Sequence, residues 1–280
     1  IVHLKDSIYS IKDQEINQTD FSYISDNSKI YFDKIFIAIH GTPAEDGLIQ
    51  DYFDNLQIPY TSCNSKVSAL TFDKFECNKK LDQLGFKCPE SILIYVEKEF
   101  SASDIIEKIG LPCFVKPNGS GSSYGISKIS KESQLSIAIK EASQHDKKII
   151  VERAIHGTEV SCGVYFDGNQ VKALPITEIV SENEFFDYEA KYNGKSQEIT
   201  PARITNKLTN EIQEITIKIY KKMNLSGICR VDFIIENNKP YIIEINTIPG
   251  LSEESIIPKQ LAEAKISLSE ILDLCLININ

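Results

Sequence analysis

The sequence predicts a mixed fold of the α/β and α+β classes. Short runs rich in β-branched residues alternate with helical stretches along the chain, a pattern typical of these classes. The run at 34–40 (KIFIAIH) indicates a buried strand that ends in Gly41, and a helix-like stretch follows at 48–56. Further along, two pairs of strand-like runs flank short polar turns and predict hairpins.

The predicted elements fall into three blocks, which we expect to be domains at 1–62, 63–156 and 157–280. In the first block, the loop after the strand should lie at the carboxyl end of a parallel strand, where open α/β sheets bind ligands. The second block should contain helices at 68–84, 101–109 and 131–143 and strands at 91–96, 113–116 and 148–152. The third should contain hairpins at 159–165/170–176 and 229–235/240–245, and helices at 205–223 and 267–277.

The composition argues against several classes of function. The chain of 280 residues has a formal net charge of −10 and a pI of about 5.0, so nucleic acid is not an expected partner, because binding it requires a basic face. No run of 18 apolar residues occurs, so no membrane-spanning helix is expected. The seven cysteines are odd in number and contain no CxxC pair, which is typical of a reducing, cytoplasmic location.

Four polar residues on two strand-like runs form the first candidate site. In Arg230-x-Asp232 and in Glu244-x-Asn246 the named residues share one face of a strand, and the predicted hairpin brings both strands side by side. Carboxylate and amide oxygens are ligands that Mg²⁺ takes together with phosphate oxygens. The alternative is an ordinary solvated face of an antiparallel sheet. The turn at 247–250 (TIPG) favours the metal site, because a solvated face needs no fixed turn there.

A Gly/Ser-rich loop at 116–125 (KPNGSGSSYG) forms the second candidate site. Such a loop after a strand can wrap phosphate oxygens with backbone N–H groups and hydroxyls, and Lys116 can supply a positive charge. The loop does not match the Walker A pattern. The alternative is a surface linker. Its position between two predicted strands, with a lysine at the preceding strand end, favours phosphate binding.

Three weaker patterns complete the set of candidate residues. The strand end at 151–155 (VERAI) with Glu159 is typical of a nucleotide hinge, although a charged strand end is the simpler explanation for it alone. His40, with Glu45 before the next helix, suits a small-substrate site, but the acid could be an ordinary helix charge and the histidine a core residue. The aromatic run at 185–192 (FFDYEAKY) suits either a lid over a pocket or an ordinary surface loop.

Taken together in this order, these motifs resemble the D-alanine–D-alanine ligases of the ATP-grasp superfamily. The similarity covers essentially the whole chain and rests on HGTPAEDGLIQ (40–50), FDK (72–74), VKPNGSGSSYG (115–125), VERAIHGTEV (151–160), FFDYEAKY (185–192), CRVDF (229–233) and IEINTIPG (243–250). The resemblance implies a three-domain ATP-grasp ligase with ATP between the central and C-terminal domains. It also implies synthesis of D-alanyl-D-alanine through a D-alanyl phosphate, for peptidoglycan precursors in a bacterial cytoplasm.

The resemblance further implies a role for each candidate residue. ATP would be held by Lys74, Lys116, Ser123, Glu152, Arg153, Ile155, Glu159, Phe185 and Lys191. Two Mg²⁺ ions, for which Mn²⁺ could substitute, would be held by Asp232, Glu244 and Asn246. The two D-alanines would contact His40, Ser122, Tyr192, Arg230, Gly250, Ser255 and Ile256. Catalysis would involve Arg230, Gly250, Ser122, Tyr192, Lys191 and His40, and Glu45 would help to hold Lys191.

One departure from the family pattern affects this interpretation. The family starts with a strand, a Gly/Ser-rich loop with a glutamate, and a helix; this unit is absent here and the chain begins with Ile1, so we expect the natural chain to begin earlier. Two alternatives stay open, an ATP-binding but catalytically impaired fragment and an ATP-grasp ligase for another amino or hydroxy acid. Tyr192 favours the dipeptide-making type. Homodimers are usual in the family, so a second copy of the chain is an implied partner.

Overall fold

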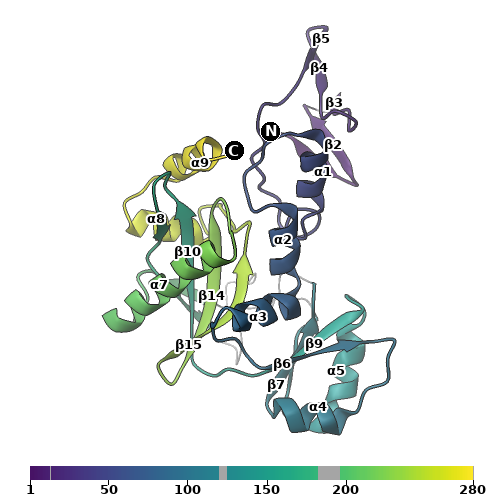
Figure 1. The fold of residues 1–280 in the computed structure, drawn as a ribbon, viewed down its shortest axis with the longest axis vertical. Helices are drawn as coiled ribbons and strands as arrows, with labels where there is room; N and C mark the ends of the chain where they lie inside the picture. Colours follow the sequence, from purple (N-terminus) through teal and green to yellow (C-terminus); the bar gives the residue numbers. More distant parts are fainter. Residues whose placement is uncertain (13, 120–124, 182–195, 280) are drawn as a thin grey trace.

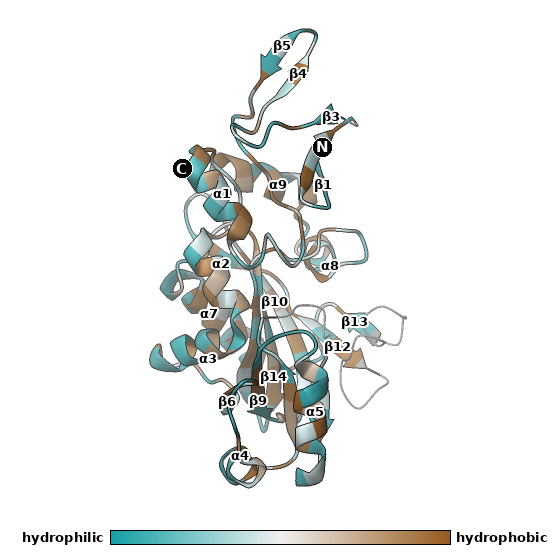
Figure 2. Ribbon diagram, turned by 90° about the vertical axis from the view of Figure 1, so that its right-hand side faces the viewer, coloured by the Kyte–Doolittle hydropathy of each residue, from teal (hydrophilic) through white to brown (hydrophobic). Residues whose placement is uncertain are grey.

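The computed structural model describes residues 1–12, 14–119, 125–181 and 196–279. Three packed regions follow one another along the long axis of the molecule (Figure 1). The N-terminal region lies at one end, the smaller sheet of the central region lies at the other, and the large C-terminal sheet lies between them. The view turned by 90° in Figure 2 shows the same order.

The N-terminal region contains short strands and one helix. The strands are β1 (His3–Lys5), β2 (Ile8–Ile11), β3 (Gln14–Glu15), β4 (Tyr23–Ser25) and β5 (Ser28–Ile30), and the helix is α1 (Leu48–Leu56), as predicted. The strands β1 to β3 form one antiparallel sheet, and β4–β5 is a separate hairpin that projects from the molecule (Figure 1). Phe21 packs edge-on against Tyr9 and Phe53 in the apolar cluster of this region. Ile248 belongs to the same cluster, so the region is tied to the end of the C-terminal sheet.

The prediction of a regular strand at 34–40 is wrong. Within the described residues, this segment makes one parallel bridge, between Ile35 and Tyr60. At the next alternate position, the backbone N–H of Ile37 donates instead to the hydroxyl of Thr61, at 3.0 Å. Because a side chain replaces the backbone acceptor there, the pairing does not extend into a ladder. The strand-like run at 1–4 overlaps β1, and the other four strands of this region were not predicted, since each is only two to four residues long.

The central region is an antiparallel sheet covered by helices. Its elements are α2 (Ser65–Phe72), α3 (Lys74–Gln83), β6 (Ser91–Tyr95), α4 (Ala102–Ile109), β7 (Cys113–Pro117), β8 (Ser127–Ile129), the 3₁₀ helix η1 (Glu132–Gln134), α5 (Leu135–Ala142) and β9 (Lys148–Arg153). The strand order is β6-β9-β7-β8. Ile109 of α4 and Leu135 of α5 pack against Val115 and Val151 of the sheet. The strands and helices predicted from residue 91 to residue 152 are confirmed.

The single helix predicted at 68–84 is wrong, because the chain breaks at Asp73 into α2 and α3. Asp73 has φ −77° and ψ 97°, outside the helical region, and its side chain accepts a hydrogen bond from the N–H of Glu76 at 3.0 Å. A carboxylate in this position satisfies one of the unpaired N–H groups at a helix start. The break therefore places Lys74 at the first position of α3, and Gly85 follows that helix with a φ of 84°.

The C-terminal region is built on the largest sheet. Its elements are β10 (Thr158–Phe166), β11 (Val171–Ala173), β12 (Thr177–Ser181), β13 (Ser196–Ile199), α7 (Asn206–Lys222), β14 (Cys229–Glu236), β15 (Lys239–Asn246), α8 (Ile256–Glu263) and α9 (Leu268–Ile277). The strand order is β13-β12-β10-β14-β15, with β11 beside β10. The hairpin predicted at 170–176 is shorter than expected, because the chain turns at its end to form β12. The elements β12, β13 and α8 were not predicted.

One apolar cluster joins the central helices to the C-terminal sheet. Cys77 and Leu81 of α3 share it with Val231 and Phe233 of β14 and with Ile212 of α7. The face of α3 opposite to solvent therefore packs on the C-terminal sheet, while the central sheet has its own core. The division into domains at residues 62/63 and 156/157 stays a prediction. Among the helices that the structure describes, none is long and apolar enough to cross a membrane.

Candidate active site

The hairpin β14–β15 carries the first candidate site. Arg230 lies opposite Asn246 and Asp232 lies opposite Glu244, so the convergence of these four side chains is confirmed. The register shifts between Asp232 and Phe233, which marks a β-bulge. Before the shift along β15, the even-numbered residues Pro240 and Ile242 face the core. After it, the even-numbered residues Glu244 and Asn246 face away from the core. The bulge thus turns Glu244 onto the face that Asp232 occupies.

Asp232 holds the centre of a hydrogen-bond network on this face. Arg230 donates from Nε to Oδ1 at 2.9 Å and from Nη2 to Oδ2 at 2.8 Å. Asn246 donates from Nδ2 to Oδ2 at 2.8 Å, and the hydroxyl of Ser161 on β10 donates to Oδ1. Burial works against the charge of Arg230, but the facing Asp232 carboxylate outweighs it and holds the pKa of Arg230 above its usual value. The network fixes the Asp232 carboxylate in one orientation.

These residues fit a divalent cation by their chemistry. Asp232 and Glu244 offer carboxylate oxygens on adjacent strands, and Asn246 offers its amide oxygen. This is the donor set that Mg²⁺ takes, usually with water and phosphate oxygens completing the shell. In the part of the chain that the structure describes, no cluster of three or more histidine, cysteine or carboxylate side chains could hold a metal ion. Asp232, Glu244 and Asn246 would share an ion on this face with water and phosphate oxygens.

A second ion pair, which is buried, lies in the central sheet. Lys116 at the end of β7 donates from Nζ to Oε1 of Glu152 on β9 at 2.7 Å. The two residues are only 7% and 4% exposed. The other oxygen of Glu152, Oε2, has no hydrogen-bond partner among the described residues. A buried carboxylate oxygen without a donor is costly, so this atom is suited to receive a donor from a ligand.

The charge of Lys74 is influenced by residues of both sheets. Burial lowers the pKa of this lysine, and the nearby charge of Lys116 lowers it further, while Glu244, Glu152 and Glu45 raise it. Lys74 therefore lies within electrostatic reach of the carboxylates of both sheets. Lys74 and Arg230 both interact with Glu244 and Glu45, and Lys74 also with Lys116; this concentration of positive charge suits a ligand of high negative charge.

The residues of the predicted nucleotide hinge run from the end of β9 to the start of β10, and so connect the central sheet to the C-terminal sheet. Arg153 donates from Nη1 and Nη2 to Oε2 of Glu236, both at 3.2 Å, and its guanidinium lies 5.4 Å from the ring centre of Tyr241. Ile155 is buried, and Glu159 lies on β10 opposite Ile234 of β14. Arg153 therefore joins β9 to the β14–β15 hairpin. Its contact with ATP, like those of Ile155 and Glu159, stays a prediction.

The predicted substrate residues gather around the turn after β15. His40 Nδ1 lies 3.0 Å from the carbonyl oxygen of Ile248. Glu45 accepts the N–H of Gly41 at 2.7 Å, and burial is the main cause that raises the pKa of Glu45. A side chain at Gly250 would come within 2.5 Å of the hydroxyl of Ser255, so the backbone of Gly250 and that hydroxyl are neighbours.

Helix α8 begins directly after Ser255, so the N-terminus of this helix points at the same turn. Ile256 is its first residue and is buried. Five predicted site residues lie outside the described residues: Ser122, Ser123, Phe185, Lys191 and Tyr192. Their roles stay predictions.

Sequence reasoning missed two residues that support this site. Ser161 and Gln260 are both fully buried. Gln260 of α8 donates to the carbonyl oxygen of Ser161 at 2.8 Å and accepts the N–H of Gly163 at 2.9 Å. The pair therefore connects the Asp232 network to the helix that starts at the substrate turn. In the sequence, the only signal was that Ser161 is a polar residue in a predicted strand of mostly apolar residues. A single serine in a strand does not indicate a functional role.

Solved structures share this architecture. The chain superposes on the VanG D-Ala:D-Ser ligase of Enterococcus faecalis with a TM-score of 0.82 and 33% sequence identity, over 93% of this chain and 76% of that one. It superposes on the D-alanine–D-alanine ligase of Bacillus anthracis complexed with ATP with a TM-score of 0.76 and 28% identity, over 88% of this chain and 78% of that one. The fold is therefore the ATP-grasp fold, and the chain is of the ATP-grasp ligase class.

Sequence comparisons narrow the class. Residues 82–277 match the family model described as the D-Ala D-Ala ligase C-terminus. The D-alanine–D-alanine ligase of Flavobacterium johnsoniae is 50% identical over 256 residues, which are 91% of this chain and 79% of the relative. The chain belongs to the D-alanine–D-alanine ligase family, as the motifs of its sequence predicted.

Proposed function

We propose that this chain joins two molecules of D-alanine into D-alanyl-D-alanine with the hydrolysis of ATP to ADP and phosphate. Its membership of the family supports this function. In the structure, the observation that supports it best is the face of the β14–β15 hairpin, where Asp232 lies opposite Glu244 and Arg230 lies opposite Asn246. Such a donor set suits divalent cations that bind together with a polyphosphate.

The reaction would take place in two steps. The carboxylate of the first D-alanine attacks the γ-phosphorus of ATP, and ADP leaves, which gives D-alanyl phosphate. The amine of the second D-alanine then attacks the acyl carbon, loses a proton, and expels phosphate. The N–H of Gly250 and the guanidinium of Arg230 would hold the oxyanion of the tetrahedral intermediate. Since Nε and Nη2 of Arg230 donate to Asp232, Nη1 would be the donor to the oxyanion.

The nucleotide would be held by both sheets. Lys74 and Lys116 would contact phosphate oxygens, and the unpaired Oε2 of Glu152 would accept a hydrogen bond from ATP. Asp232, Glu244 and Asn246 would hold two Mg²⁺ ions, for which Mn²⁺ could substitute. Bound ions would supply neutralisation of the phosphate charge.

The substrate residues would lie around the turn at 247–250. His40 would orient the first D-alanine, and the hydroxyl of Ser255 with the backbone of Ile256 would hold the carboxylate of the second. We further propose that the chain works in the cytoplasm as a homodimer, with domains at 1–62, 63–156 and 157–280. Neither nucleic acid nor a membrane is a proposed partner.

The test is ADP release by this 280-residue chain with Mg²⁺, with and without D-alanine, together with mass spectrometry of the product. We expect D-alanine to stimulate ADP release and D-alanyl-D-alanine to accumulate in equal amount. D-Serine and D-lactate, each offered in competition with D-alanine, test the choice of second substrate. The proposal would be contradicted if D-alanine did not change the rate of ADP release. It would also be contradicted if the product with D-serine or D-lactate exceeded D-alanyl-D-alanine at neutral pH.

A further inference from the structure

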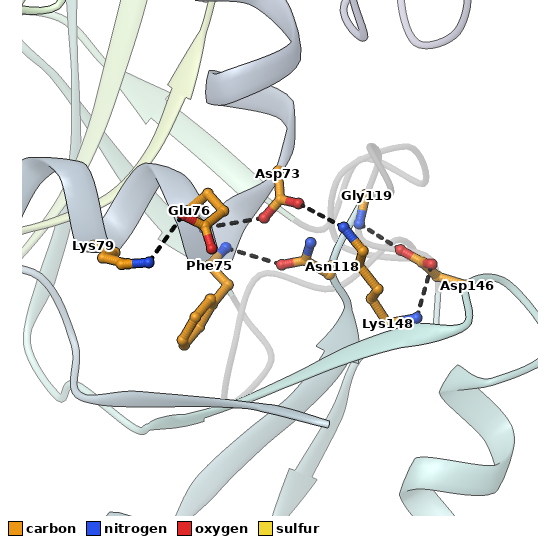
Figure 3. Close-up of polar contacts among 8 residues, drawn as sticks. All are labelled: Asp73, Phe75, Glu76, Lys79, Asn118, Gly119, Asp146 and Lys148. Carbon is orange, nitrogen blue, oxygen red and sulfur yellow. Dashed lines mark hydrogen bonds and ion pairs between the residues drawn. The ribbon is translucent and has the colours of Figure 1, made fainter. Parts of the chain in front are cut away.

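Asn118 lies at a junction between α3, β7 and β9, two residues after Lys116. Figure 3 shows its side chain turned toward the start of α3, where Oδ1 accepts the N–H of Phe75 at 2.9 Å. The backbone carbonyl of Asn118 accepts the N–H of Lys74 at 3.3 Å. Asn118 is only 1% exposed, so these bonds form away from water.

The first N–H groups of a helix have no partner within the helix and must find one elsewhere. In α3, the carboxylate of Asp73 takes the N–H of Glu76, and Asn118 takes those of Lys74 and Phe75. Most of the capping of this helix therefore comes from the strand that carries Lys116. This capping by a residue distant in the sequence distinguishes α3 from α2, α4, α7 and α9. In each of those four helices, the side chain that caps the N-terminus belongs to the residue directly before the helix.

The other side of the junction is equally bonded. The N–H of Asn118 donates to the carbonyl oxygen of Lys148 at 2.9 Å. Asp146 accepts the N–H of Gly119 at 2.7 Å and the N–H of Lys148 at 2.9 Å. Lys148 then donates from Nζ to Asp73 at 3.3 Å, which closes the network back onto α3 (Figure 3). The helix start and the two strand ends therefore form one rigid unit.

This unit holds two like charges near each other. Burial lowers the pKa of Lys74, and the charge of Lys116 contributes in the same direction. The two lysines repel each other, and Glu152, which accepts from Lys116, offsets part of this repulsion. Holding α3 at the end of β7 opposes that repulsion and keeps both lysines in place before a phosphate group binds.

We propose that Asn118 is a positioning residue for ATP, which fixes the start of α3 relative to β7 and so sets the distance between Lys74 and Lys116. This inference rests on the proposed function, in which both lysines contact phosphate. In this role Asn118 acts through the two lysines, because its bonds are to the start of α3 and to β9. The competing explanation is that Asn118 only caps a helix and contributes to stability.

The test compares Asn118→Ala with Ser101→Ala. Ser101 caps α4 by accepting the N–H of Asp104, on the outer side of the central sheet, so its loss affects a helix start without affecting either lysine. Calorimetry measures the Kd of Mg·ATP, steady-state kinetics measures the KM for D-alanine, and thermal unfolding measures stability. We expect Asn118→Ala to raise the Kd of ATP about tenfold and to leave the KM for D-alanine within twofold. Ser101→Ala should leave both unchanged.

A double variant separates positioning from a failure to fold. Asp73 and Asn118 each accept one N–H at the start of α3 through a side-chain oxygen, which both an amide and a carboxylate provide. Asp73→Asn combined with Asn118→Asp exchanges the carboxylate and the amide and keeps both caps, so it should return the Kd of ATP to within about threefold of the parent. If Asn118→Ala lowers the melting temperature but binds ATP as the parent does, or if the exchange restores folding without restoring affinity, the inference is wrong. If the parent itself binds no ATP, the proposed function fails instead.

Discussion

The Arg230–Asp232 pair on β14 is partly buried and the Lys116–Glu152 pair between β7 and β9 is buried, and the two pairs are bonded to different extents. Asp232 accepts from Arg230, Asn246 and Ser161, so both of its oxygens are satisfied. Glu152 accepts from Lys116 on one oxygen, while its other oxygen has no partner among the described residues. The Asp232 pair is complete, because both carboxylate oxygens accept hydrogen bonds within the protein. The Glu152 pair leaves one carboxylate oxygen open to a donor from a ligand.

This difference indicates that the two ion pairs have different roles in the proposed reaction. A fully bonded carboxylate is held in one orientation, which suits a group that must stabilise charge as it develops, because such groups act best when they are already ordered. A buried oxygen without a donor destabilises the empty protein and gains a partner when the ligand arrives. We therefore expect the Asp232 pair to govern the rate of the reaction and the Glu152 pair to govern the affinity for ATP.

The largest expected effect comes from Asp232→Asn. The substitution removes the counter-charge of Arg230 and one carboxylate from the proposed metal face, so we expect kcat to fall at least about 100-fold. The loss of the charge of a partly buried carboxylate that accepts from three side chains should also lower the free energy of unfolding by about 2 kcal/mol. Rates of ADP release at saturating ATP and D-alanine measure the first effect, and urea unfolding measures the second.

A matched control exists in the same sheet. Arg203 donates to Glu178 from Nε at 2.8 Å and from Nη2 at 2.7 Å, a bidentate pair like that of Arg230. Glu178 lies opposite Val160 on the face of the sheet that α7 covers, away from Ser161 and the site. Glu178→Gln should therefore affect stability and leave kcat unchanged. If Asp232→Asn also leaves kcat within threefold of the parent, the distinction between the two ion pairs is lost.

A smaller effect is expected from Glu152→Gln. The substitution weakens the pairing of Lys116 and replaces the open acceptor by an amide, so we expect the Kd of ATP to rise between about 10- and 100-fold. In contrast to Asp232→Asn, kcat at saturating ATP should change less than tenfold. Calorimetric titration with Mg·ATP, alongside kcat measured at several ATP concentrations, gives both values. A fall in kcat without a change in Kd would reverse the roles assigned to the two pairs.

The complete pair could largely be predicted from the sequence, because its residues are close together along the chain. The strand-like runs at 229–235 and 240–245 predicted β14 and β15. The polar residues between them predicted the turn, in which Asn237 and Asn238 have positive φ. Two-residue spacing then placed Arg230 and Asp232 on one face. The bulge beside Asp232 could not be seen, because it depends on how the partner strand pairs.

The remaining supports of the site come from tertiary contacts, which a single sequence does not reveal. The break at Asp73 has no proline or glycine to mark it, and it is stabilised by Asn118 from another strand. The hydroxyl of Ser161 meets Asp232 only because β10 pairs with β14 in one register. The segment at 34–40 has the composition of a buried strand, but its pairing ends where the N–H of Ile37 donates to the side chain of Thr61.

The smallest effect tests whether the complete pair needs all of its donors. Ser161→Ala removes one of the donors to Asp232 and leaves those from Arg230 and Asn246, so the carboxylate should keep its charge but gain freedom to rotate. We expect the free energy of unfolding to fall by about 1 kcal/mol. The Mg²⁺ concentration for half-maximal activity should rise a few-fold, with kcat at saturating Mg²⁺ within threefold of the parent.

Thr216→Ala is the control for this last variant. Thr216 is also fully buried, and its hydroxyl donates to the carbonyl oxygen of Ile212 at 2.8 Å, inside α7 and away from the site. Both variants should lose similar stability, and only Ser161→Ala should change the Mg²⁺ requirement. If both titrate with Mg²⁺ like the parent, the Ser161 hydroxyl contributes packing alone, and the orientation of Asp232 depends on Arg230 and Asn246.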